Sequence, residues 1–172
     1  MERLFAPWRH AWVTSAAAQS DGAASGGGRC LFCLVRDASA DEQNLVVHRA
    51  KGALLMLNRY PYNGGHLLVV PEEHRGALQD LSPDARAAVM ELSAQALFAL
   101  DRLHHPDGFN LGVNQGRSGG AGVPDHVHMH IVPRWNGDTN FMTTVADTRV
   151  VSQDLPRLRE ELAAYFAGER PR

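Results

Sequence analysis

The sequence predicts an α+β fold, a mostly antiparallel sheet of about five strands with one long helix and one C-terminal helix. Five short apolar runs, each bounded by glycine, asparagine or proline, are typical of strands. Runs that follow one another through short turns favour antiparallel pairing, and one long amphipathic segment separates the first three from the last two. We therefore expect the helices to cover one face of the sheet.

The predicted strands form two groups along the chain. The turn "YPYNGG" separates the second run from the third, and the glycine-rich segment "QGRSGGAGVPD" joins the fourth to the fifth. The predicted strand ranges are 44–49, 53–58, 66–71, 108–114 and 126–134.

Two segments carry helix signals. Ser82 is a suitable N-cap with Pro83 at the first helical position, and apolar residues then recur at helical spacing to about His104. A second helix is expected from about Asp154 to Phe166, before Gly168.

The 172 residues suffice for one compact domain, predicted at 29–172. An aromatic arm, 1–14, and a flexible Gly/Ala/Ser linker, 15–28, precede it. Lys and Arg total 17 against 19 Asp and Glu, so no basic bias indicates a nucleic-acid partner. No apolar run of about 18 residues and no signal peptide is apparent, which predicts a cytoplasmic protein without a membrane partner.

Three histidines, His126, His128 and His130, alternate with apolar residues in "HVHMHIV". On a strand they share one face, so the apolar set is expected in the core and the imidazoles in a cleft. The outer two would lie roughly 13 Å apart, too far to bind one zinc ion together. Neutral imidazole is a nucleophile and proton carrier with a pKa of about 6.5, which suits phosphoryl or nucleotidyl transfer. The alternative is an ordinary exposed strand face, less expected for three histidines in register.

The preceding loop, "NQGRSGGAG", has a composition that suits oxyanion binding. Its glycines let backbone N–H groups converge, and Arg117 and Ser118 add a charge and a hydroxyl. The loop lacks the GK[ST] ending of a P-loop, which argues against an NTPase of that kind. Taken alone, it is equally compatible with a plain turn between strands.

The run "HVHMHIV" resembles the H-φ-H-φ-H-φ-φ signature of the histidine triad (HIT) superfamily of nucleotidyl hydrolases and transferases. The likeness extends from Cys30 to about Phe141, including "LNRYPYNGGHLLVVPEEH", and the arm segment "LFAPWR" is similar too. These stretches are most similar to the bacterial branch of diadenosine tetraphosphate phosphorylases and hydrolases. The resemblance implies a HIT-like fold and an enzyme that cleaves dinucleoside polyphosphates.

The resemblance also implies roles for single residues. His128 is the expected nucleophile, which carries the nucleotide before phosphate or water accepts it. His126 and His130 complete the catalytic triad, and His130 is expected to hold phosphate oxygens. The expected substrate-binding residues are Asn58 at the ribose, Asn114 near the scissile phosphate, Arg117, Ser118 and Gly122 in the loop, and Trp135 beside the base. For Trp135, packing at a subunit interface is an equal alternative.

Two positions leave alternatives open. Gly122 stands where hydrolase branches carry glutamine, which favours phosphorolysis or a loop that binds through its backbone. His66 also matches a family position, and we favour a buried hydrogen-bonding role for it.

The resemblance implies structural zinc bound by Cys30, Cys33, His74 and His126, and no organic cofactor. With no export signal, a structural disulfide is the less expected use of "CLFC". Two reduced cysteines packed near the sheet remain an alternative. A thioredoxin-like redox pair is disfavoured because no βαβ pattern surrounds it.

Relatives in this superfamily are homodimers, so a second copy of the chain is an expected partner, with Trp8 and Trp12 of the arm lying over it or mobile. Other functions stay open. One is a non-catalytic nucleotide-binding or sensor protein with a structural zinc, and within the enzyme class the alternatives are nucleoside phosphoramidate hydrolysis and nucleotidyl-sugar transfer.

Overall fold

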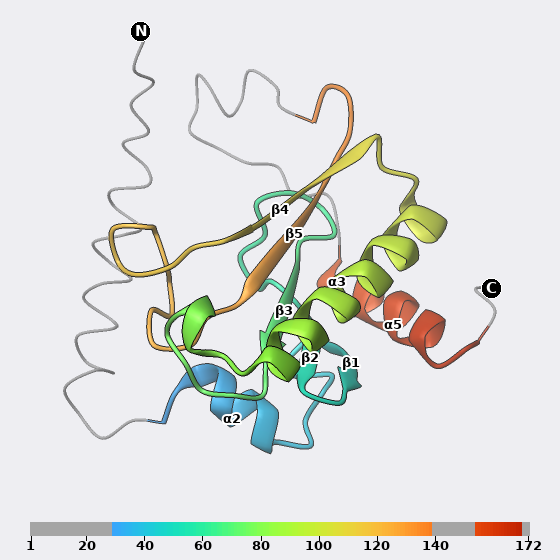
Figure 1. The fold of residues 1–172 in the computed structure, drawn as a ribbon. Helices are drawn as coiled ribbons and strands as arrows, with labels where there is room; N and C mark the ends of the chain where they lie inside the picture. The colour runs from blue at the N-terminus through green and yellow to red at the C-terminus, as the bar shows by residue number, and fades with distance from the viewer. Residues whose placement is uncertain (1–28, 139–153, 170–172) are drawn as a thin grey trace, which may run out of the picture.

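The computed structural model describes residues 29–138 and 154–169. Five strands form one antiparallel sheet in the order β1-β2-β3-β5-β4, which confirms the predicted α+β class (Figure 1). The strands are β1 (Val46–Ala50), β2 (Ala53–Leu57), β3 (Leu67–Pro71), β4 (Gly108–Val113) and β5 (Met129–Arg134). The arm and linker, 1–28, lie outside the described residues, so their boundaries stay predictions.

Helices α3 (Pro83–His104) and α5 (Leu155–Phe166) cover one face of the sheet. Figure 1 shows α3 running across the strands with α5 beside it. The predicted start of α3 is confirmed, because the Ser82 hydroxyl accepts the Ala85 N–H at 3.1 Å and caps the first turn. The core under these helices contains Leu55, Leu57, Leu67, Val69, Leu92, Leu100, Ile131, Leu158 and Leu162.

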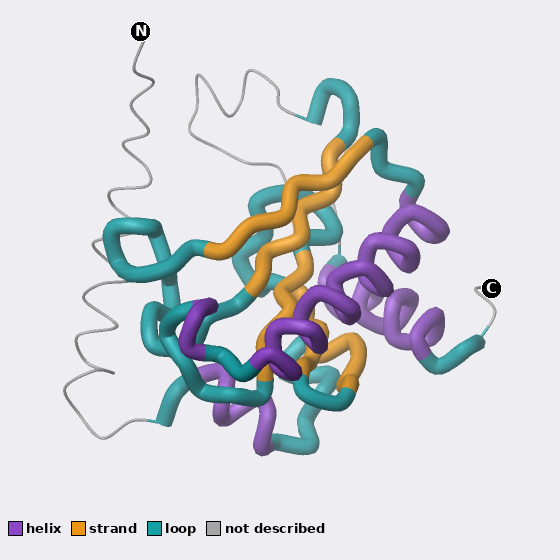
Figure 2. Tube along the Cα trace, viewed as in Figure 1, coloured by secondary structure: helices purple, strands orange, loops and turns teal. Residues whose placement is uncertain are grey.

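The opposite face carries a third helix, α2 (Leu31–Asp37), which the sequence analysis missed. Every residue of β2 and β3 is buried, so both faces of these strands are covered. Phe32 and Val35 of α2 pack on the second face, against Leu54, Met56, Leu68, Val46 and Val70. The expectation that helices lie on one face only is therefore wrong. Figure 2 shows α2 as a short helix apart from the α3–α5 pair.

The described ranges contain no helix that is both long enough and apolar enough to cross a membrane.

Candidate active site and metal centre

The first two triad histidines precede the strand on which they were predicted. The strand β5 begins at Met129. Upstream, the His126 N–H donates to Val123 within a turn, and the Val127 N–H donates to the Arg75 carbonyl at 2.7 Å. These N–H groups bond to a turn and to the chain beyond β3, and the pairing of β5 with β3 begins at Met129.

The predicted alternation of faces nevertheless holds. The rings of His126 and His128 both contact Phe32 on the α2 side. Val127 points the other way and packs with Leu81 and Ala85 at the start of α3. The imidazoles are buried, with exposed fractions of 0 % for His126, 5 % for His128 and 9 % for His130. His126 is thus fully enclosed, and what solvent access remains belongs to the other two.

The orientation of His128 follows from one hydrogen bond. Its Nδ1 lies 2.9 Å from the carbonyl oxygen of His126, and a carbonyl can only accept. In the neutral ring Nδ1 therefore carries the proton and Nε2 carries the lone pair. Burial lowers the pKa of His128, which keeps the ring neutral at pH 7.

A second hydrogen-bond chain fixes His130. The Tyr62 N–H donates to Nδ1 of His66 at 3.0 Å, so the neutral His66 ring carries its proton on Nε2 and donates to His130 Nδ1, also at 3.0 Å. His130 then presents an N–H at Nε2. The Asn114 Nδ2 atom lies 3.5 Å away and is also a donor, so these two N–H groups converge and do not bond to each other. Burial, and then the charge of His128, lower the pKa of His130 to about 4. His66 is itself buried and hydrogen-bonded, the role favoured from the sequence.

Only some of the predicted substrate-binding residues lie close to the histidine triad. Asn114 follows Val113, which pairs with Met129, so the glycine-rich loop starts beside the triad. Arg117, Ser118 and Gly122 are exposed on that loop. Its turn is closed by the Ala121 N–H, which donates to the carbonyl of Gly116 at 3.2 Å. Phosphate binding by this loop stays a prediction.

Two other predicted positions have different surroundings. The Asn58 side chain supports its own turn, because its Oδ1 accepts the Tyr60 N–H and its Nδ2 lies 3.3 Å from His66 Nδ1. Trp135 follows the far end of β5, roughly 20 Å along the chain from His128. A ribose contact by Asn58 and a base contact by Trp135 both stay predictions.

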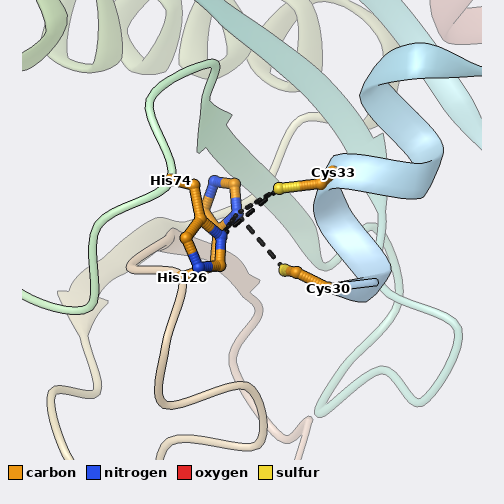
Figure 3. Close-up of side chains that lie close together, drawn as sticks. All are labelled: Cys30, Cys33, His74 and His126. Atoms are coloured by element: carbon orange, nitrogen blue, oxygen red, sulfur yellow. Dashed lines mark hydrogen bonds between the residues drawn. The ribbon is translucent and has the colours of Figure 1, made fainter. Parts of the chain in front are cut away.

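The four predicted metal ligands come together at the edge of α2 (Figure 3). Cys30 precedes α2 and Cys33 lies in its first turn, while His74 follows β3 and His126 precedes β5. The ligand atoms of all four residues lie within 4.8 Å of one another.

The separations within this Cys2His2 centre match tetrahedral zinc. The Nδ1 atoms of His74 and His126 are 3.3 Å apart, and the resolved S···N distances run from 3.3 to 3.7 Å. Ideal Zn–N and Zn–S bonds require roughly 3.4 Å for N···N and roughly 3.6 Å for S···N. Burial, and then the neighbouring Cys30, raise the pKa of Cys33. A raised pKa makes the Cys33 thiolate harder to form. A bound cation would offset that cost, because cysteine binds metal as the thiolate anion.

A hydrogen bond behind the centre selects the metal-facing nitrogen of His126. Its Nε2 lies 2.9 Å from the Pro71 carbonyl and therefore carries the proton, leaving the Nδ1 lone pair directed at the cysteines and His74. The roles of Pro71, Tyr62 and Phe32 were not predicted from the sequence. Phe32 alone had a usable signal, as one of the two apolar residues between Cys30 and Cys33.

Comparisons with known proteins agree with this geometry. The HIT domain family model matches residues 39–137. The AP-4-A phosphorylase of Mycobacterium tuberculosis is 37 % identical over 169 residues, covering 98 % of this chain and 86 % of that protein. The adenosine 5'-monophosphoramidase of Schizosaccharomyces pombe is 27 % identical over 135 residues, covering 78 % of this chain and 96 % of that one.

Among solved structures, a Zn-bound histidine triad family protein from Mycobacterium smegmatis matches with a TM-score of 0.65 and 27 % identity. The match covers 81 % of this chain and 94 % of that one. The fold and the matched ranges agree with the likeness seen in the sequence. The chain belongs to the HIT domain family.

Proposed function

We propose that this chain cleaves dinucleoside polyphosphates, with diadenosine tetraphosphate as the first substrate to test. The observation that carries the proposal is the 2.9 Å contact between His128 Nδ1 and the His126 carbonyl. It leaves an unprotonated Nε2 on a buried, neutral ring, the form in which imidazole attacks phosphorus. The 37 % identity to an AP-4-A phosphorylase supports the choice of substrate.

The proposed reaction has two displacements. His128 Nε2 forms a bond to the α-phosphorus, and the bond from that phosphorus to the bridging oxygen breaks, releasing ATP. Inorganic phosphate or water then attacks the same phosphorus, the N–P bond breaks, and ADP or AMP leaves. The Nε2–H of His130 supports both steps by donating to a phosphate oxygen, where negative charge builds.

We also propose that zinc occupies the Cys2His2 centre as a structural ion. When bound, it links the segments that carry Cys30, Cys33, His74 and His126, and so fixes the chain just before the nucleophile. The nucleotide chemistry remains with the histidines.

A homodimer is proposed as well, formed through the β4 edge. β4 is the last strand in the sheet order, and its middle residues are exposed. Leu111 on β4 and Phe98 on α3 are large apolar side chains with exposed fractions of 43 % and 69 %. An edge strand beside such side chains suits pairing with a second copy.

The deciding experiment is product analysis after incubation with diadenosine tetraphosphate, with and without inorganic phosphate. ADP and ATP formed only with phosphate identify a phosphorylase, and AMP and ATP formed in both conditions identify a hydrolase. A nucleoside phosphoramidate is the second substrate to test, because a HIT relative is an adenosine 5'-monophosphoramidase. Binding of nucleotide without any product would overturn the enzymatic proposal in favour of a nucleotide-binding protein.

His128→Asn tests the proposed nucleophile. We expect it to abolish turnover while nucleotide binding persists, because the amide nitrogen is not a nucleophile. His48→Asn is the matched control, since His48 stacks on Phe166 away from the triad. Turnover retained in His128→Asn would exclude the covalent route.

A further inference from the structure

Phe32 is the residue of α2 that faces the triad. It is 3 % exposed and sits between Cys30 and Cys33 in the sequence. Its ring centroid lies 5.4 Å from that of His126, edge to face, and 4.8 Å from that of His128, tilted by 56°. Both separations are in the range of direct aromatic contact. The phenyl ring therefore packs directly against the imidazole of His128.

The His128 ring has one hydrogen bond and two ring contacts. The His126 carbonyl holds Nδ1, and the ring packs against Phe32 and against His130, whose ring centroid lies 4.9 Å away. Phe32 is the one of these three neighbours that comes from α2, and its bulk limits rotation of the His128 ring away from the Nδ1 bond. A nucleophile must be aligned with phosphorus for in-line attack, so its rate depends on this restraint.

The helix that carries Phe32 is fastened differently at its two ends. At the C-terminal end, the Arg49 guanidinium donates to the carbonyls of Val35, Arg36 and Ala38 at 2.8 to 2.9 Å. At the N-terminal end, Cys30 occupies the cap position without a capping hydrogen bond from its side chain, and the first turn contains no acidic residue.

That N-terminal end is where the metal ligands gather (Figure 3). Cys30 and Cys33 bracket Phe32, and their partners His74 and His126 lie on two other segments. A metal bound there would join the Phe32 end of α2 to the triad segment, in addition to the packing of Phe32 on the sheet, while Arg49 secures the opposite end.

We propose that Phe32 is a positioning residue for His128, and that the metal bound by the Cys2His2 centre keeps it there. The proposal rests on the proposed function, since His128 is the nucleophile only in that scheme. The centre then acts on the rate of nucleotidyl transfer in addition to stabilising the fold.

The kinetic test compares Phe32→Leu with Val35→Ala in the zinc-loaded, full-length protein. Val35 lies on the same helix and in the same core cluster, but at the end of α2 that Arg49 secures. Phe32→Leu should slow single-turnover transfer of AMP to His128 by roughly 10- to 100-fold, with little change in AMP affinity. Val35→Ala should keep the wild-type rate. Equal slowing in both variants, or an unchanged rate in Phe32→Leu, overturns the proposal.

A spectroscopic test needs no turnover. Nitrogen-15 NMR of the His128 ring should report a single Nδ1–H tautomer in the zinc-loaded wild type. That signature should be lost in Phe32→Leu and after zinc removal, while amide signals of β2 and β3 persist. A tautomer that survives both changes overturns the proposal, and loss of the sheet signals on zinc removal overturns its metal half. If the NMR results are as expected but the wild type forms no nucleotidyl-His128, the proposed function is refuted and the positioning role of Phe32 still stands.

Discussion

Gly76 occupies a position with no room for a side chain. A Cβ atom there would lie 2.8 Å from the Pro124 carbonyl oxygen and 3.5 Å from Cα of Asp125. Those two residues lead directly into His126. Gly76→Ala should therefore push the triad segment away from the metal centre.

We expect Gly76→Ala to lower the free energy of unfolding by about 1 to 3 kcal/mol, the usual cost of overpacking. Zinc affinity, measured by competition with a chelator, should fall with it. Gly108→Ala is the matched control, because a Cβ there meets nothing within 4 Å, and its effect should stay within about 0.5 kcal/mol. If zinc affinity is unchanged in Gly76→Ala, the segment that leads into His126 accommodates the added Cβ without moving away from the metal centre.

His130 makes stability depend on pH. Its pKa is about 4 in the folded protein and about 6.5 in an unfolded chain. Between these values the unfolded chain binds a proton that the folded protein does not, so the stability present above pH 6.5 is lost as the pH falls towards 4. The slope reaches about 1.4 kcal/mol per pH unit.

Chemical denaturation at pH 7 and at pH 5 isolates this effect when the wild type is compared with His130→Asn. Asparagine does not titrate, so the variant should lose up to about 2 kcal/mol less than the wild type over that interval. Loss of metal at acidic pH affects both proteins and cancels in the comparison. Parallel losses in the two proteins would mean that His130 titrates normally.

At the residue scale, the sequence predicted ligand types better than hydrogen-bond geometry. The four metal ligands were predicted from the family resemblance, and the structure brings them together. The tautomers of His126 and His128 were not predictable, because each depends on one carbonyl, from Pro71 or from His126, that the fold brings to the ring. Every residue has a backbone carbonyl, so the sequence does not show which carbonyl a given histidine will meet in the fold.

Among the elements, α2 depends most on side chains from elsewhere. Its seven residues make fewer than two turns, too few to be stable alone or to show a period. Arg49 of β1 satisfies its last carbonyls and also pairs with Asp41 at 2.7 Å. The long helix α3 was predictable at both ends because its signals are local, whereas α2 exists through contacts distant in sequence.

Arg49→Met should destabilise the protein by about 1 to 3 kcal/mol, because three carbonyls at the end of α2, one of them part-buried, lose a charged donor. Arg59→Met is the control, since Arg59 makes a single exposed bond to the Gln43 carbonyl. Hydrogen exchange should also speed up in 31–37 more than in β2. Equal effects of the two substitutions would mean that α2 is secured without Arg49.

For the whole molecule, the sheet has two edge strands, β1 and β4, and β4 is the more exposed of the two. The other strands with long apolar stretches are covered on both faces, but β4 is exposed along its middle. Leu111 pairs with Ile131, which faces the α3 side, so Leu111 points to the same side as that helix. A two-fold axis beside β4 would bring the two copies of Leu111 near each other.

Leu111→Arg should therefore break the proposed dimer, because a two-fold axis would bring two like charges together. Light scattering should give about twice 18.8 kDa for the wild type and about 18.8 kDa for this variant. Leu34→Arg is the matched control, since Leu34 is 45 % exposed, close to the 43 % of Leu111, but lies on α2 across the sheet. If the Leu111→Arg variant stays dimeric, the dimer interface does not lie at β4. A wild type that is monomeric would refute the proposed dimer, and the exposure of Leu111 and Phe98 would then need another explanation.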